Sequence, residues 1–554
     1  MSWLRAAVLR VAGEGVRPIL LGATNFPEVA KQKGAVLEKA YSLSDRAELG
    51  QFILDANIGL VRAEYFYKLH KAKIAFPRRQ EAERDICQLP DGSQLSAFVT
   101  RREVREWSKG TKHCIICSVS HCWETREHPD PCRFQLEQLV NYVSLKADFY
   151  DIWLFYDYMS LFQFERQTDQ EEASFRQSMA NMHVLYAHES TRTLRIQSLT
   201  PKPIWEAMLS SEARVHVYHL DTGGIAERPL KDLVANRTPY GDRGWCKAEV
   251  EWSSTRTSTA SNQCIDSTEG QAELDGSSPG RVPTIPEVFE KQMAQAAFTH
   301  RSDALAVFHL QKKIFFQKVS VCEESELEHL PKAEVAALAR ALPEYQSLRS
   351  LRLHRFDCGP AEAKAFCQAV TRLGALRELV ATNCQDPVVF VKALGEALQH
   401  NSAILKIDLG FNRIGDEGAK ALGEVLKQNS AITTINLDYN SIGDEGAQAL
   451  GEGLKHNNAV ALINLKFNCI GDVGAQAFGE ALLHNSVITQ IDLKRNHISD
   501  GGAKALGEAL QHNSVVTQID LKWNRISDEG WKALAPHHSR INLLPVHEPD
   551  QGCG

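Results

Sequence analysis

Polar and aromatic side chains follow two short apolar segments that have the length and composition of buried strands. The segments are HCIICSVS (113–120) and DIWLFYD (151–157). Ligands of parallel α/β sheets bind at the carboxyl ends of the strands. The side chains at or just beyond these two ends, which we expect to line a ligand cleft, are Ser118, Ser120, His121, Trp123 and Asp157, followed by Gln163.

Helical segments separate these strands. Residues 131–147 have a helical pattern, and residues 192–199 (RTLRIQSL) are predicted to form a third strand. In the segment 171–187, apolar side chains recur at i, i+4, i+7 and i+11, as they do on one face of a helix: Phe175, Met179, Met182 and Tyr186. The alternation of strands and helices predicts an α/β domain in which a parallel sheet carries helices on its faces.

The cysteines predict reduced thiols rather than a disulfide framework or a metal site. There are 13, an odd number without regular spacing, which favours a cytoplasmic protein. The local cluster Cys114, Cys117 and Cys122 lies on the first strand and just after it. Residues i and i+3 of a strand point to opposite faces, so Cys114 and Cys117 cannot easily share a metal. We expect no zinc site there.

The C-terminal part of the chain contains a 28-residue repeat. Its marker residues are Asn412, Asn440, Asn468, Asn496 and Asn524, with Cys384 and Phe356 at the same position in two earlier units. Each unit has the pattern L-x-x-L-x-L-x-x-N/C followed by a helical segment, and resembles the leucine-rich repeats of the ribonuclease-inhibitor type. Seven units are clear, a capping helix is expected at 332–342, and a C-terminal cap at 540–544. Stacked units predict a horseshoe with parallel strands on the concave side.

Two columns of side chains on the predicted concave surface are candidates for binding a protein partner. Aromatic residues beside charged ones are typical of protein-binding surfaces. The first column comprises Phe411, Tyr439, Phe467, Arg495 and Trp523, and the second includes Lys466, Lys494 and Lys522. The alternative is that these aromatic rings only shield the strand edges of neighbouring repeats.

Several strings upstream of the repeats resemble the fungal heterokaryon-incompatibility (HET) domain. They are SVSHCWE, IWLFYDYMSLFQFERQ, MANMHVLY and RGWCKAE, in that order, within residues 106–252. The HET family is regarded as a divergent relative of the Toll/interleukin-1 receptor (TIR) domain. The stretch 245–249 (WCKAE) is also similar to the W-C-x-x-E pattern of TIR domains.

This resemblance implies two different functions. Many TIR-like domains act as self-association modules, whereas active ones cleave NAD with the glutamate of that pattern. Carried over, Glu249 becomes the candidate catalytic residue, with Trp245 and Arg243 beside it. A carboxylate there would stabilise the oxocarbenium-like state formed when the nicotinamide–ribose bond breaks. The alternative is that Glu249 serves the first turn of a helix, where the helix dipole favours acidic residues, and that Trp245 is plain core.

Composition narrows the classes of partner. The 554 residues carry 62 Lys and Arg against 69 Asp and Glu, a net charge of −7, so no global basic field favours nucleic acid or membranes. We expect no transmembrane helix, because no apolar run approaches the roughly 18 residues required. A mitochondrial transit peptide at the N-terminus is a minor alternative to an ordinary first helix.

We therefore predict five regions along the chain: a mainly helical segment (1–105), the HET/TIR-like domain (106–252), a flexible linker (253–285), connecting helices (286–330) and the repeats with their caps (331–546). The sequence contains no G-x-x-x-x-G-K-[ST] phosphate-binding loop, which argues against a standard NLR-type receptor. The predicted function is recognition and signalling in the manner of innate-immunity receptors: the repeats bind a protein, and the upstream domain self-associates. The alternative is an NAD glycohydrolase controlled by the repeats, with NAD as substrate and no cofactor.

Overall fold

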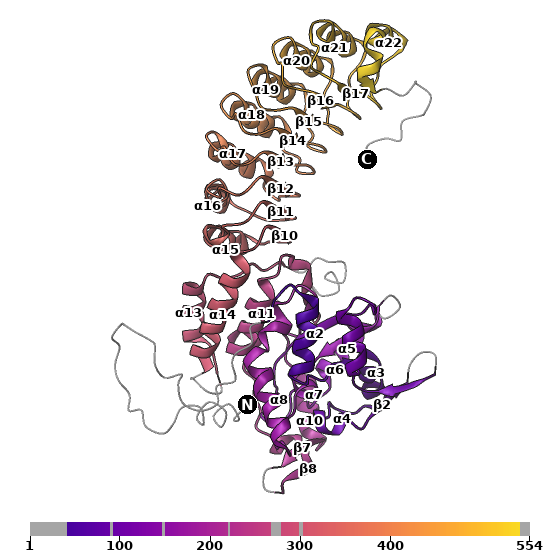
Figure 1. The fold of residues 1–554 in the computed structure, drawn as a ribbon, viewed down its shortest axis with the longest axis vertical. Coiled ribbons are helices and arrows are strands. Elements are labelled where there is room, and N and C mark those ends of the chain that lie inside the picture. The colour runs from indigo at the N-terminus through magenta and orange to yellow at the C-terminus, as the bar shows by residue number, and fades with distance from the viewer. Residues whose placement is uncertain are drawn as a thin grey trace, which may run out of the picture. The chain divides into compact units, whose positions relative to one another are not determined.

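The computed structural model of the protein describes residues 41–88, 92–146, 150–219, 222–266, 279–298 and 303–542 (Figure 1). These residues fall into two compact units. Unit 1 takes its residues from Met1–Arg256, Ala260–Ser278 and Ile285–Phe315, and unit 2 from Thr257–Thr259, Pro279–Thr284 and Phe316–Gly554. The expected first helix and its alternative, a transit peptide, lie outside the described residues.

Unit 1 is built on a five-stranded sheet. The strand order is β1 (Val61–Arg62), β5 (Ile152–Phe155), β4 (Ile115–Ser120), β6 (Thr191–Arg195) and β9 (Asn262–Cys264). β4, β5, β6 and β9 are parallel, and β1 is antiparallel to β5. The three strands predicted from the sequence are confirmed as β4, β5 and β6. From β4 the chain continues to β5 on one side and then to β6 on the other side, so the order of the strands reverses beside β4. Open α/β sheets bind ligands at such a topological switch point.

Helices cover both faces of this sheet. One hydrophobic core joins Ile116 and Trp153 to side chains of helices α2, α9, α11 and α13, and the other joins Cys117 and Leu154 to α3 and α6. Cys114 packs in the core of Ile116, opposite Cys117, so the predicted placement of the two thiols on opposite faces is confirmed. The bounds are α2 (Arg46–Asp55), α3 (Ala63–Ala72), α6 (Phe134–Ser144), α9 (His183–Ala187), α11 (Gly244–Ser254) and α13 (Pro286–Gln295).

The N-terminal segment is not purely helical and does not pack separately. Besides α2, α3, α4 (Arg79–Ala82) and α5 (Arg101–Ser108), it contains β1 and the hairpin β2 (Ile86–Gln88) and β3 (Gln94–Ser96). Phe52 of α2 shares a core with Phe155 of β5. The packing therefore continues across the expected boundary at 105.

The expected linker at 253–285 also contains ordered structure. β9 forms part of it and extends the sheet beside β6, while residues 267–278 lie outside the described residues. The remaining elements of unit 1 are α7 (Asp157–Ser160), α8 (Asp169–Asn181), α10 (Lys202–Ser210) and the antiparallel pair β7 (Arg214–His219) and β8 (Gly224–Pro229). α14 (Asp303–Val319) contains the division between the units.

Unit 2 is an array of alternating strands and helices around a nine-stranded parallel sheet in sequence order. The strands lie on the inner side of its curve and the helices on the outer side (Figure 1). The strands are β10 (Glu324–Glu328), β11 (Ser350–His354), β12 (Glu378–Thr382), β13 (Lys406–Asp408), β14 (Thr434–Asn436), β15 (Leu462–Asn464), β16 (Gln490–Asp492), β17 (Gln518–Asp520) and β18 (Ile541–Asn542). The helices are α15 (Lys332–Ala341), α16 (Pro360–Val370), α17 (Pro387–Leu398), α18 (Gly415–Leu426), α19 (Asp444–Lys455), α20 (Asp472–Leu482), α21 (Asp500–His512) and α22 (Asp528–Leu534).

The array begins earlier than the sequence pattern predicts. β10 pairs in parallel with β11 and lies before the expected boundary at 331, in the region assigned to connecting helices. α15, expected as a capping helix, therefore follows a strand of its own, β10. Strand β18 pairs with β17 at the position of the expected C-terminal cap.

The repeated asparagine joins each repeat to its neighbours, as its position in the pattern predicts. The side-chain amide of Asn468 donates to the carbonyls of Leu437 at 2.9 Å and Leu465 at 2.9 Å. Its oxygen accepts from the backbone amides of Asn440 at 3.1 Å and Ile442 at 2.9 Å. These buried groups have no strand partner at the turn, so the asparagine supplies one. We call these repeated bonds of Asn412, Asn440, Asn468, Asn496 and Asn524 the asparagine ladder.

Two further series of hydrogen bonds also recur from repeat to repeat, and the sequence did not predict them. Asn457 donates to the carbonyls of Leu426 and Asn429, and its counterparts recur every 28 residues at the start of each unit. Asp444 accepts from the amides of Gly471 and Gly474, which places an acidic cap on the first turn of the next helix. At the end of the array, the guanidinium of Arg540 occupies the donor position of the next asparagine.

Candidate functional site

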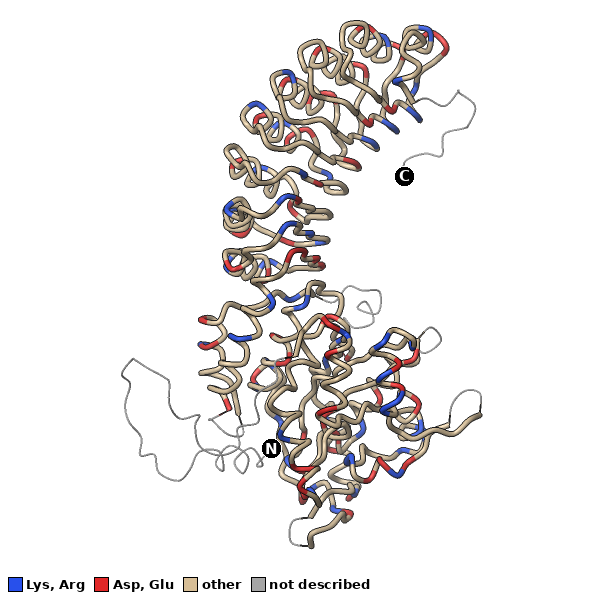
Figure 2. The backbone as a smooth tube through the Cα atoms, in the orientation of Figure 1, with Lys and Arg blue, Asp and Glu red and all other residues tan. Residues whose placement is uncertain are grey.

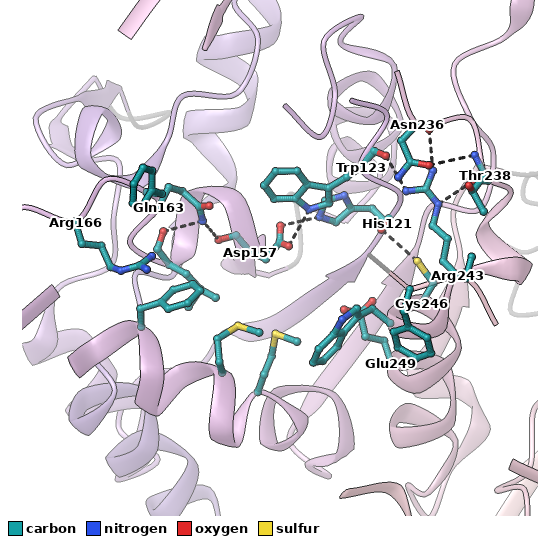
Figure 3. A pocket seen from close by; sticks show the side chains of 18 residues that line it. His121, Trp123, Asp157, Gln163, Arg166, Asn236, Thr238, Arg243, Cys246 and Glu249 are labelled. Carbon is teal, nitrogen blue, oxygen red and sulfur yellow. Dashed lines mark hydrogen bonds and ion pairs between the residues drawn. The ribbon is translucent and has the colours of Figure 1, made fainter. Parts of the chain in front are cut away.

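A cavity of about 290 Å³ opens in unit 1 beside the carboxyl ends of β4 and β5 (Figure 3). It gathers side chains from segments far apart in the sequence. Seven residues singled out from the sequence line it: His121, Trp123, Asp157, Gln163, Arg243, Trp245 and Glu249. Ser118 and Ser120 do not line it.

The two serines of β4 lie beneath the cavity. The Ser118 hydroxyl is buried and donates to the carbonyl of Leu185 at 2.6 Å, which ties β4 to α9. The Ser120 hydroxyl is also buried; it lies 2.6 Å from the Tyr240 hydroxyl and donates to Glu249 Oε2 at 2.5 Å. Ser120 thus positions a residue of the cavity wall. The prediction that Ser118 and Ser120 line the cleft is wrong.

Asp157 organises one side of the cavity. Its Oδ1 lies 3.0 Å from His121 Nε2 and accepts from the backbone amide of Tyr158, and its Oδ2 accepts from Trp123 Nε1 at 3.0 Å. The His121 ring stacks on Tyr156 at 4.1 Å between centroids. With Nε2 donating to the carboxylate, the buried Nδ1 of His121 has no hydrogen-bond partner within the described ranges.

Glu249 forms the opposite wall. α11 begins at Gly244, so Glu249 lies in the second turn, and the alternative that it serves the helix dipole in the first turn is wrong. Trp245 stands four residues earlier and faces the same cavity. Burial raises the pKa of Glu249 to about 8, against the weaker opposing effect of the Ser120 hydrogen bond.

The two carboxyl groups are held in different protonation states at neutral pH. Burial favours the neutral form of Asp157, but the attraction of His121 and the hydrogen bonds from His121 and Trp123 outweigh it, so the pKa of Asp157 lies below its ordinary value. Glu249, by contrast, is mostly protonated at pH 7, and its carboxyl O–H can donate a hydrogen bond. One anionic and one neutral carboxyl group across a cavity is an arrangement suited to acid–base chemistry.

Arg243 fastens the rim rather than facing the cavity with free donors. Its guanidinium donates to three backbone carbonyls, those of Thr238 at 2.8 Å, Trp123 at 2.7 Å and Asn236 at 3.0 Å. Figure 3 shows it between the loop after β4 and the loop before α11. These donors of Arg243 are therefore committed to the backbone of the rim.

Trp245 is half-buried and packs at the edge of the core. Its ring meets Trp252 edge-on at 6.3 Å, and its indole nitrogen approaches Asp303 Oδ2 at 3.4 Å. Because Trp245 also lines the cavity, it is not plain core.

Sequence reasoning missed part of the lining. Phe175, Met179 and Met182 contribute an apolar wall; the sequence signal was their helical stripe, which indicated a buried face but not a cavity. Asn236, Thr238 and Phe298 come from segments without any usable pattern. A Cβ added at Gly244 would overlap the Phe298 ring, so a glycine is required where this ring crosses the start of α11.

The second candidate site is the first predicted column of unit 2. Phe411, Tyr439 and Phe467 stack face to face, with centroid distances of 4.5 and 4.0 Å and interplanar angles of 14° and 17°. The Arg495 guanidinium continues the column between Phe467, at 4.8 Å, and Trp523, at 5.1 Å. We call these five residues the ring stack.

The ring stack lies just beyond the strands and not on them. All five of its residues have a left-handed backbone, with φ between 52° and 61°. β14 ends at Asn436, three positions before Tyr439. The column therefore follows the turn at the carboxyl edge of the sheet, which corrects its expected placement among the strand positions.

The lysine column runs beside the ring stack. Lys466 pairs with Asp438 at 3.4 Å. Lys494 and Lys522 form no ion pair with any described residue, and their amides bind Asp492 and Asp520 instead.

A family model described as leucine-rich repeat matches residues 400–423, 428–451, 462–479, 484–507 and 512–535. Among solved structures, actin-binding site 2 of leiomodin-1 is 25% identical over 22% of this chain and 71% of that one, with a TM-score of 0.20. Internalin C2 of Listeria monocytogenes is 16% identical over 42% of this chain and 83% of its own (TM-score 0.26). Another internalin of that organism, inlF, is 14% identical over 55% and 77% (TM-score 0.29). No curated protein matches the chain significantly.

The family match and the ladders identify the C-terminal region as leucine-rich repeats within a mixed α/β protein. Among the helices of the described ranges, none combines the length and hydropathy needed to cross a bilayer.

Proposed function

We propose that this leucine-rich repeat protein recognises a protein partner through the carboxyl edge of strands β13–β17. The observation that carries the proposal is the ring stack: Phe411, Tyr439 and Trp523 remain 49%, 38% and 37% exposed although they are large apolar side chains. Leucine-rich repeats typically present their strand side to partners. Exposed aromatic and arginine side chains are the residues that most often dominate binding energy.

The alternative, that the rings only shield neighbouring repeats, accounts for part of this geometry. Each ring does lie against the next, and such stacking contributes roughly 0.5–1.5 kcal/mol per pair. Shielding alone does not require the remaining exposure, because the strand edges are already joined by the asparagine ladder. The exposed surface is therefore available for a partner.

The test is to pan a random peptide display library against the full chain and against two matched double variants. Phe467→Ala with Trp523→Ala removes two members of the ring stack. Val473→Ala with Leu483→Ala removes two exposed apolar side chains from α20 and its end, on the helix side. We expect enriched peptides to lose binding only to the first variant. Equal loss in both, or unfolding of the first variant, would make the rings structural.

Within this proposal, unit 1 relays binding by self-association, as its resemblance to HET and TIR-like domains implies. Light scattering of the full chain with and without an enriched peptide tests the relay, and an unchanged mass at all concentrations would contradict it.

The second candidate is an NAD glycohydrolase, favoured by the position of Glu249 opposite Trp123 and Asp157 in one cavity. Water and NAD would give ADP-ribose, nicotinamide and a proton, with the nicotinamide–ribose bond broken and a ribose–oxygen bond formed. An ionised Glu249 would stabilise the positive charge developing at the anomeric carbon. The indoles of Trp123 and Trp245 could stack on the leaving ring.

Nicotinamide release by the purified chain tests this candidate. Glu249→Gln keeps an acceptor for Ser120 and removes the charge, and Glu206→Gln on the exposed face of α10 is the control. Turnover that is lost with the first substitution and kept with the second supports the enzyme. No release at any pH between 6 and 9 by the unmodified chain contradicts it.

A further inference from the structure

Four cations at the carboxyl edge of the last repeats form no ion pair with any described residue. Among the ion pairs of the described residues, none includes Lys494, Lys522 or Arg525. The guanidinium of Arg495 lies over the rings of Phe467 and Trp523. Figure 2 shows Lys and Arg along the strand side of these repeats. We call Lys494, Arg495, Lys522 and Arg525 the basic edge.

At the other end of the same array, several cations lie beside acidic side chains of neighbouring strands. Arg352 pairs with Glu378 at 2.9 Å, and His354 lies 3.6 Å from Glu326. Arg349 approaches Glu323 at 3.8 Å. The repeats can therefore pair charges across strands, whereas the four cations of the basic edge form no such pair among the described residues.

Inside the ring stack, the faces that neighbouring side chains share are covered, so the inner rings offer their edges. Tyr439 is covered on one face by Phe411 and on the other by Phe467. The faces of Phe467 and Trp523 are further occupied by Arg495. Aromatic rings carry negative potential on their faces and positive potential at their edges. The exposed parts of the column therefore add to the positive field of the cations.

We propose that the basic edge and the ring stack together bind an acidic, extended peptide segment of the partner protein. This inference rests on the proposed function of the repeats and adds the chemistry of the partner. Carboxylates of the peptide contact the free ammonium and guanidinium groups, and its backbone runs along the column of ring edges. Charge complementarity of this kind governs the rate of association and the choice of partner.

A nucleic acid fits the same surface less well. Single strands bind proteins by stacking bases on open aromatic faces, and inside the ring stack the facing surfaces are already occupied by neighbouring side chains. Asp492 and Asp520 also border the lysine column, with Asp520 one strand beyond Asp492. A continuous phosphate backbone would meet these carboxylates, whereas a peptide can place an uncharged residue beside them.

Binding of a fluorescein-labelled poly-glutamate peptide to the full chain, followed by anisotropy, tests the inference. Lys494→Glu with Lys522→Glu reverses two charges of the basic edge. Lys504→Glu with Lys532→Glu makes the same change on the exposed helix side, on α21 and α22. We expect the first double variant to weaken binding about tenfold or more, and the control to change it less than about twofold.

Three results would overturn the inference: equal weakening in both double variants, tighter binding of poly-lysine than of poly-glutamate, or tighter binding of oligo(dT) at the same ionic strength. If poly-glutamate does not bind but ring-dependent peptides are enriched from the display library, the acidic chemistry fails and protein recognition stands. If the library also yields no ring-dependent peptide, the proposed function itself fails.

Discussion

The hydroxyl of Ser120, at the end of β4, donates to the carboxyl group of Glu249 on α11 at 2.5 Å. The same hydroxyl lies 2.6 Å from that of Tyr240, so the central strand holds a wall residue of the cavity through a buried polar chain. Glu249 is thereby fixed in an environment where its neutral form is preferred.

That preference predicts how the stability of unit 1 depends on pH. The pKa of Glu249 is raised in the folded chain to about 8 from an ordinary value of 4.5, so the folded state binds the proton more tightly than the unfolded state. The resulting stability is fully present below about pH 4.5 and is lost as pH rises through about 8. We expect Glu249→Gln to abolish this pH-dependent decrease in the free energy of unfolding, which is on the order of a few kcal/mol.

Urea unfolding at pH 5.5 and pH 8.5 measures this effect. The unmodified chain should lose more free energy of unfolding between the two pH values than Glu249→Gln does. Glu206→Gln, at an exposed carboxyl group of α10, should behave like the unmodified chain. Identical pH profiles for all three proteins would contradict the assigned protonation state.

The hydrogen bonds of Arg243 lead to a second prediction, on the stability of unit 1. Lysine keeps the charge but cannot donate to three carbonyls in the planar geometry of a guanidinium. We expect Arg243→Lys to lower the free energy of unfolding of unit 1 by about 2–4 kcal/mol, because buried carbonyls lose their donors. Arg228→Lys is the matched control, since half-buried Arg228 donates to a single described carbonyl, that of Asp232. Equal values for the two variants would show that the rim does not depend on Arg243.

The asparagine ladder predicts a loss confined to unit 2. Asn468→Ala removes two donors and leaves the buried amides of Asn440 and Ile442 without their acceptor. We expect a cost of about 2–4 kcal/mol in chemical denaturation. Gln476→Ala on the outer face of α20 should change stability by less than about 0.5 kcal/mol. A cost below about 1 kcal/mol for Asn468→Ala would mean that water replaces the ladder there.

Close helix packing in unit 2 makes a fourth prediction. A Cβ added at Gly453 of α19 would lie 2.4 Å from the carbonyl oxygen of Gly423 in α18, a backbone atom that cannot turn aside. Overpacking of this kind costs about 1–3 kcal/mol, more than the roughly 1 kcal/mol that alanine gains in a helix. Gly453→Ala should therefore lower the thermal midpoint of unit 2.

The control for Gly453 is Gly374→Ala, where no atom lies within 4 Å of an added Cβ. This variant should keep the original midpoint. If Gly453→Ala also leaves the thermal midpoint of unit 2 unchanged, α18 and α19 separate more easily than their contact indicates.

The sequence predicted the central strands and the repeats because both follow simple rules. β4 and β5 are continuous apolar runs buried on both faces, and the asparagine positions recur in a strict register. Placing ligand-binding residues at the strand ends brought His121, Trp123 and Asp157 to one cavity. These features depend on local composition together with a general property of parallel sheets.

The features that the sequence did not reveal depend on long-range contacts or on edge positions. β9 (NQC) and β10 (ESELE) are polar strands at sheet edges, where charged residues are tolerated and no apolar pattern forms. The role of Arg243 depends on loops more than a hundred residues apart, joined at Trp123 and Asn236. Likewise, no local pattern indicated that the residue before each asparagine adopts a left-handed backbone.

Ladder bonds in unit 2 connect residues of one 28-residue copy with those of the next, as the bond from Asn440 to Asn468 illustrates. A complete copy duplicated between two others would therefore find every partner already in place on both sides. Unequal crossing-over within the coding DNA could lengthen or shorten the chain by whole copies without any compensating substitution. The length of the repeat array is thus open to evolutionary adjustment in steps of one repeat.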